Sequence, residues 1–144
     1  MRQQDLHNSF KLVETIPPQT VGTTGTGRTG KVLDRSNYQG VELFVQYGSI
    51  TATNATFTAI IYEGDVTGTM TSVANAQLIG AQGSFGVGQA ATRTSGVSKN
   101  VVHKVGYTGL KRYVSANVKS TVTAGAVIAA AFLFGNPNQM PVAS

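Results

Sequence analysis

The order of apolar and polar residues is most regular between Val101 and Pro137, where it predicts three β-strands joined by short turns. The middle strand alternates strictly, and strict alternation predicts one face in a core and the other in solvent. One face carries Arg112, Val114, Ala116 and Val118, and the other carries Lys111, Tyr113, Ser115, Asn117 and Lys119.

The third strand of this segment, Ala126 to Phe134, is apolar on both faces. A continuous apolar run of this length predicts a strand that is covered on both sides. Gly135, Asn136 and Pro137 then end the strand, because a sheet interior does not accommodate this combination. No residue here suggests catalysis, so we interpret the segment as the buried frame of a β-sandwich or barrel.

Earlier segments add further strands. Val41 to Ile50 and Ala55 to Glu63 each place apolar residues on one face, while Phe44 lies on the more polar face of the first. Phe10 to Ile16 has a weaker strand pattern, and Ala74 to Ile79 fits a short helical turn and a strand equally well. We therefore predict an all-β, single-domain antiparallel β-sandwich of roughly seven or eight strands.

The length of 144 residues is that of one domain with a core. We expect residues 1–16 to form an extended N-terminal arm and residues 17–144 to form the β-sandwich domain. Residues 80–96 are rich in glycine and small polar side chains, which predicts a long surface loop. Loops of this length in compact domains are usually functional or disordered.

Charge is distributed unevenly along the chain. All six acidic residues precede residue 66, together with five basic ones, which gives that part a net charge of −1. The remainder has six basic residues and no acidic one, hence +6. A surface of one sign attracts partners of the opposite sign, so we expect the second half to face an acidic partner.

Other sequence features bear on the cellular compartment of the protein and on membrane association. The chain has no cysteine, which excludes disulfides and thiolate metal sites and fits a reducing cytoplasm. The N-terminus lacks the apolar run of a signal peptide. The longest apolar run, Ala126 to Phe134, has nine residues, too few to cross a bilayer as a helix. We expect a protein made in a cytoplasm, with no membrane partner.

Glycine motifs of nucleotide-binding proteins have partial matches. Gly25 to Gly30 fits GxGxxG, and Gly25 to Lys31 fits the first seven positions of a P-loop. Both motifs need a preceding strand and a following helix, since the phosphate binds at the helix N-terminus. Here two prolines precede the motif closely, no helical pattern follows, and Val32 replaces the Ser or Thr that would bind magnesium. We interpret these as loop glycines and expect no cofactor.

Candidates for metal binding and catalysis are few. His7 and His103 lack neighbouring ligands, and Glu63 and Asp65 flank a glycine in a pattern typical of a turn. No GxSxG motif presents a nucleophilic serine. We predict no metal site, no catalytic residue and no small-molecule substrate, so the protein is not expected to be an enzyme.

A nucleic-acid-binding β-barrel is another class of protein to consider. Tyr107 and Tyr113 lie in the basic half, and single-strand binding barrels combine aromatic residues with a basic groove. The chain has only 11 lysines and arginines, however, so we interpret the basic half as a solvated face and do not expect nucleic acid as its partner.

Several short segments of the chain form a recognisable series. The most distinctive is KVGYTGLKRYVSANV, Lys104 to Val118, which is followed by an apolar strand and Gly-Asn-Pro. The others are Pro17–Val21, Val41–Ile50, Phe57–Asp65 and Ala76–Gly80. This series resembles small virion proteins of tailed phages, usually encoded beside the major capsid protein. The chain departs from the pattern in its longer glycine-rich segment and its lower content of acidic residues.

The resemblance implies a capsid decoration or cement protein, a trimer that binds the major capsid protein on the shell. Its expected location is the virion, after synthesis in the host bacterial cytoplasm. The alternative is a head–tail joining or tail structural protein.

We expect the arm, the glycine-rich loop and the basic half to make the contacts with partners. Phe85 is either an exposed anchor or folded back over the rim of the sandwich. The predicted contact residues are Phe10, Leu12, Phe85, Val87, Arg93, Lys104, Lys111 and Arg112.

Overall fold

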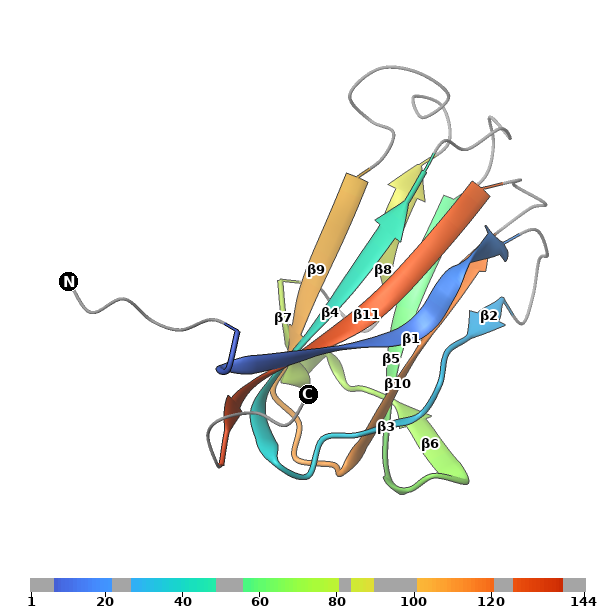
Figure 1. Cartoon of the computed structure of the whole chain (residues 1–144). Helices are drawn as coiled ribbons and strands as arrows, with labels where there is room; N and C mark the ends of the chain where they lie inside the picture. The colour runs from blue at the N-terminus through green and yellow to red at the C-terminus, as the bar shows by residue number, and fades with distance from the viewer. Residues whose placement is uncertain are drawn as a thin grey trace.

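The computed structural model describes residues 7–21, 27–48, 56–80, 84–89, 101–120 and 126–138. These residues form two antiparallel sheets that face each other in a β-sandwich (Figure 1). Helical structure in the described residues amounts to one 3-10 turn, Asn75–Gln77. The fold class predicted from the sequence is confirmed.

One sheet has five strands in the spatial order β1-β11-β4-β9-β7. Their bounds are β1 Phe10–Val21, β11 Ala126–Pro137, β4 Tyr38–Tyr47, β9 Val101–Tyr107 and β7 Leu78–Ile79. The other sheet has six strands, with the path β2-β10-β5-β6, where β3 also pairs with β10 and β8 with β5. Their bounds are β2 Arg28–Thr29, β3 Leu33–Asp34, β5 Thr56–Val66, β6 Thr69–Ser72, β8 Ser84–Gln89 and β10 Tyr113–Ser120.

The described residues contain more strands than the seven or eight expected, because β2, β3 and β7 are two-residue segments. Ala74 to Ile79 contains both alternatives left open by its pattern, the 3-10 turn followed by β7. Strand β1 begins at Phe10, inside the segment predicted as an arm. It pairs with β11 from Phe10 to Val21, so residues 10–16 belong to the five-stranded sheet.

The core lies between the two sheets. Alternate residues of β4, β5, β10 and β11 point into it, as the alternation along these strands predicts. Burying one large apolar side chain stabilises a fold by about 1.5–3 kcal/mol, so this layer dominates the stability. Its largest fully buried members are Ile16, Leu43, Val45, Tyr47, Phe57, Ile61, Ile128, Phe132 and Phe134.

The prediction that one face of the middle strand, now β10, is exposed to solvent is wrong. Val114, Ala116 and Val118 face the core, but Ser115 and Asn117 on the other face are only 2% and 3% exposed. The segment containing β2 lies against them, since Asn117 Nδ2 donates to Thr29 Oγ1 at 2.7 Å and Ser115 Oγ to the Gly30 carbonyl at 3.1 Å. Polar side chains are buried here because this segment supplies hydrogen-bond partners.

Gly30, the last glycine of the GxGxxG match, links the two sheets. Its N–H donates to the carbonyl of Ala116 on β10, and the next N–H, of Lys31, donates to Thr15 on β1. A Cβ at Gly30 would collide with Thr15 and Ile16, so the close approach requires glycine. This glycine serves backbone packing, and extended chain follows it.

The prediction that the third strand, now β11, is covered on both sides is also wrong, because one of its two faces is partly exposed. Ile128, Phe132 and Phe134 are buried against the other sheet. On the opposite face Val127 is 50% exposed, and Ala129, Ala131 and Leu133 are partly exposed. No described element covers that face, because all strands adjacent to β11 lie beside it in the same sheet.

Candidate interaction surfaces

The uncovered face of the five-stranded sheet carries an open apolar groove with a volume of about 520 Å³. It runs across β1, β11, β4 and β9, which lie side by side (Figure 1). Exposed apolar residues that gather in one patch commonly mark an interaction site. Its lining includes Phe10, Leu12, Phe44, Val102, Ala131 and Leu133. We call this the sheet face.

Strand register orders the sheet face in rows. Glu14 is paired with Ala131, Ala131 with Phe44, and Phe44 with Lys104, so one row crosses four strands from an acid to a base. Glu14 also forms an exposed ion pair with Lys31 at 3.1 Å. The middle of the row is apolar and its two ends have opposite charge.

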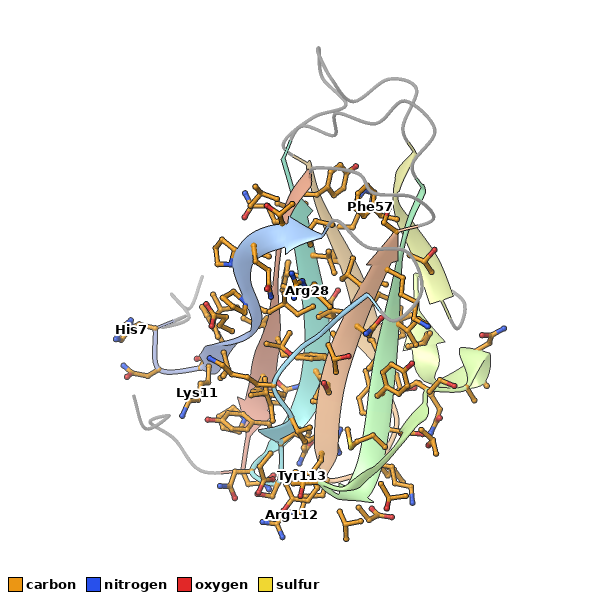
Figure 2. All side chains as sticks on the ribbon, turned by 90° about the vertical axis from the view of Figure 1, so that its right-hand side faces the viewer. His7, Lys11, Arg28, Phe57, Arg112 and Tyr113 are labelled. Atoms are coloured by element: carbon orange, nitrogen blue, oxygen red, sulfur yellow. The ribbon has the colours of Figure 1, made fainter. Side chains whose placement is uncertain are left out.

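A second surface is the end loop, residues 108–112, which connects β9 to β10 at one end of the sandwich. Figure 2 shows Arg112 and Tyr113 at this end, far from Phe57. Gly109 lies so close to the ring of Tyr107 that a Cβ there would overlap it. Leu110 is 89% exposed at the tip.

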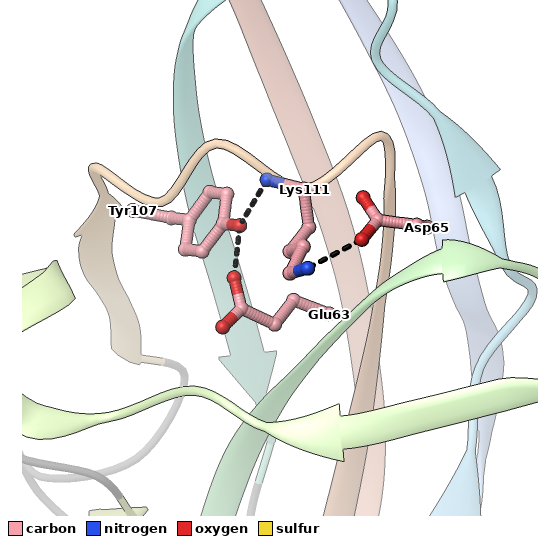
Figure 3. Close-up of polar contacts among 4 residues, drawn as sticks. All are labelled: Glu63, Asp65, Tyr107 and Lys111. Atoms are coloured by element: carbon pink, nitrogen blue, oxygen red, sulfur yellow. Dashed lines mark hydrogen bonds and ion pairs between the residues drawn. The ribbon is translucent and has the colours of Figure 1, made fainter.

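Tyr107 anchors the end loop to β5 (Figure 3). Its hydroxyl donates to the buried carboxylate of Glu63 and accepts from the N–H of Lys111 at 3.3 Å. Burial raises the pKa of Tyr107, and the hydrogen bond to Glu63 raises it further. The phenol therefore stays protonated and remains a donor throughout the neutral range.

Ion pairs hold the rest of the end loop. Lys111 pairs with Asp65, which raises the pKa of Lys111 (Figure 3). Arg112 donates to Asp34 Oδ2 twice, from Nε at 3.0 Å and Nη2 at 2.7 Å. The hydrogen bond from Arg112 holds the pKa of Asp34 below its usual value.

Arg35 adds one more contact to the end loop. It donates to the carbonyl of Gly109 at 2.9 Å, and its guanidinium lies 5.6 Å from the ring centroid of Tyr107. The backbone around Leu110 is thus held from both sides before any partner binds.

The structure places five of the eight predicted contact residues on these two surfaces. Phe10 and Leu12 line the sheet face, and Lys104 lies at its β9 side. Lys111 and Arg112 belong to the end loop. Phe85 and Val87 lie in β8, whose backbone alone is described, so the two interpretations of Phe85 stay open. Arg93 lies outside the described residues.

Sequence reasoning missed Leu110 and gave Phe44 no role. A signal existed for both, because Leu110 is an apolar residue within a predicted turn and Phe44 interrupts a polar face. The strongly uneven charge along the chain is also partly balanced in space. Lys111 and Arg112 of the basic half are paired with Asp65 and Asp34 of the first half.

Neither surface assembles an evident reaction centre from described residues. No group of three or more metal-ligating side chains occurs among them. His103 stacks on Tyr47 with 5.5 Å between ring centroids, and its Nε2 lies 3.1 Å from the tyrosine hydroxyl, which places it in the sheet framework. In the part of the chain that is described, no helix is long and apolar enough to cross a membrane.

The chain matches no protein-family model, and no curated protein matches it in sequence. Its fold is similar to the SPBc2 prophage-derived protein YomS, with 13% identity and a TM-score of 0.45 over 88% of this chain and 93% of that one. It is also similar to a chain of the Bacillus endospore appendages, described as disulfide-linked pili, with 11% identity and a TM-score of 0.40 over 94% and 98%. A Desmodium yellow mottle tymovirus chain has 10% identity and a TM-score of 0.32 over 100% and 97%. These similarities concern the fold alone.

Proposed function

We propose that this chain is a virion structural protein that binds the assembled shell of a tailed-phage head and decorates or stabilises it. The observation that carries the proposal is the end loop. Lys104 to Val118, the segment with the strongest resemblance to phage virion proteins, folds into β9, the end loop and β10. The resembling segment therefore includes a prepared contact site.

The end loop suits binding because its conformation is set in advance. Tyr107, Arg35, Lys111 and Arg112 hold its backbone, so little conformational entropy is lost when Leu110 enters a partner pocket. Burying one leucine contributes about 1.5–3 kcal/mol. On a shell of many identical sites, linked copies turn such modest contacts into tight attachment.

Basic residues beside Leu110 fit an acidic rim on the major capsid protein. The side chains of Lys111 and Arg112 are 47% and 56% exposed while they pair with Asp65 and Asp34. Acidic groups of the shell are therefore expected to reach both cations while these pairs continue to hold the loop.

The test is co-sedimentation of the purified protein with shells assembled from the major capsid protein alone. Leu110→Asp should weaken binding by roughly 10- to 100-fold, which is the loss of one buried leucine expressed as affinity. Val32→Asp, an exposed apolar residue between β2 and β3, is the matched control and should bind normally. Undiminished binding of Leu110→Asp would exclude the end loop as the contact.

Copy number separates decoration from the alternative role. Quantitative gel densitometry of purified particles should give hundreds of copies for a decoration protein, whereas a few copies would indicate a head–tail joining or tail protein. Deleting residues 1–16 is not a clean test of the arm, because it removes half of β1 from the sheet.

A further inference from the structure

We propose that the sheet face is covered by a second copy of this chain, packed face to face through a two-fold axis. The axis runs along the strands, between β11 and β4. This inference does not depend on the proposed shell binding, because it rests on the register of one sheet. It also supplies the second cover that the apolar pattern of β11 predicts and that no described element of this chain provides.

The geometry follows from symmetry. Rotation about such an axis keeps each residue at its height along the strands and exchanges the two sides of the sheet. Strand β11 then faces β4 of the second copy, and β1 faces β9. Sheets of the same twist pack in this aligned manner about 10 Å apart, with their side chains interdigitated.

Applied to the row of Glu14, Ala131, Phe44 and Lys104, the rotation places unlike residues opposite each other. Phe44 faces Ala131 of the second copy, a large side chain against a small one. Glu14 faces Lys104 of the second copy, an acid against a base. Each contact occurs twice, because the axis makes the interface self-complementary.

The row of Gln46 repeats the match in size. Gln46 faces Ala129 of the second copy, because these two are register partners. In the row of Leu133 and Glu42, Leu12, which is 60% exposed, faces Gly106 of the second copy, and that glycine lies against Ile79 of its own chain. A large residue therefore meets an alanine in two successive rows, those of Phe44 and Gln46, which favours interdigitation.

Two further charges belong to the sheet face. Glu42 lies on β4, beside the axis, and faces Leu133 of the second copy. Its Oε2 lies on the side of β9, the strand that carries Lys104, 3.6 Å from the position that a Cβ of Gly106 would occupy. Lys31 is paired with Glu14 at the β1 side, and both are exposed.

The area is sufficient for a stable pair. Four strands about 4.8 Å apart and about ten residues long, at roughly 3.4 Å per residue, give a footprint of about 650 Å² per copy. The total of about 1,300 Å² lies within the range of specific interfaces, roughly 1,200–2,000 Å². A two-fold pair also differs from the trimer that the family resemblance implies.

Sedimentation equilibrium of the purified chain tests the pairing. The protein should be a concentration-dependent dimer, and Phe44→Asp should make it monomeric. Lys104→Glu and Glu14→Lys should each weaken the dimer by roughly 100-fold, because two symmetry-related contacts become repulsive at about tenfold each. The double variant Glu14→Lys/Lys104→Glu should restore the dimer to within a few-fold of the original.

Arg28→Glu is the matched control, since it makes the same charge change on β2, in the other sheet, and should leave the dimer intact. Thermal unfolding of each variant verifies the fold. A chain that is monomeric at all concentrations, a trimer, or a dimer indifferent to Phe44→Asp would each overturn the proposal. Failure of the charge exchange to restore pairing would overturn the register.

Discussion

Strand β11 has two apolar faces in two different environments. On the inner face Ile128 and Phe132 are fully buried against the opposite sheet. On the outer face Val127 is half exposed, and Ala131 and Leu133 line an open groove. The side chains are of similar kind, so hydrophobicity does not distinguish them. The comparison teaches that an apolar run does not by itself tell whether both faces of a strand are buried within the chain.

The largest contrast between the faces is expected from neighbouring residues. Phe132→Ala should lower the free energy of unfolding by about 3–5 kcal/mol, because it opens a cavity in the core. Leu133→Ala, in protein diluted enough to be monomeric, should cost less than about 1 kcal/mol. Urea titration of both variants measures the difference. Equal losses would show that the outer face is buried in the single chain as well.

Two variants on opposite faces of β9 extend the comparison to polar groups. Tyr107→Phe removes the donor to Glu63 and leaves a buried carboxylate short of a partner, which should cost about 1–3 kcal/mol. Val102→Thr, on the outer face of the same strand, should change stability by less than about 0.5 kcal/mol. Thermal unfolding of dilute protein compares them, and a Val102→Thr loss as large as that of Tyr107→Phe would contradict the assignment of faces.

A conservative change tests how finely the two faces differ. Ile128→Val should destabilise the chain by about 0.5–1.5 kcal/mol through the loss of one buried methylene. Val127→Thr, which keeps the shape at an exposed position, should be nearly neutral in the monomer. Chemical denaturation resolves both changes. A nearly neutral Ile128→Val would mean that the core repacks there without loss.

The smallest effect is expected at the exposed end loop, on acidification. Arg112 lowers the pKa of Asp34 in the folded chain, so their contact stabilises the fold above the ordinary aspartate pKa of about 3.9. That stability is lost as the pH falls through the lowered folded pKa. Asp34→Asn should therefore show a slightly weaker fall in stability below pH of about 4. Parallel pH profiles of the two proteins would contradict this role of the pair.

The strands were predicted well wherever the local pattern of apolar residues alone determines which side chains are buried. The core faces of β4, β5 and β10 follow from alternation, and the existence of β11 follows from its continuous apolar run. The prediction failed at Ser115 and Asn117 because a distant segment, residues 28–30, supplies their partners. A local pattern does not encode such a contact.

The candidate surfaces were predictable only in part. Phe10, Leu12 and Lys104 were expected contact residues, and the strands bring them onto one face. The end loop was not foreseen, because its order depends on Asp34, Asp65 and other residues remote in sequence.

Pro17 and Pro18 lie in β1, the outermost strand of the five-stranded sheet, and both are exposed. Neither has an N–H to offer a strand from another molecule, and the pairing register shifts at this point. The β1 margin is therefore a poor template for a further strand at this point, which protects the sheet against growth from that side.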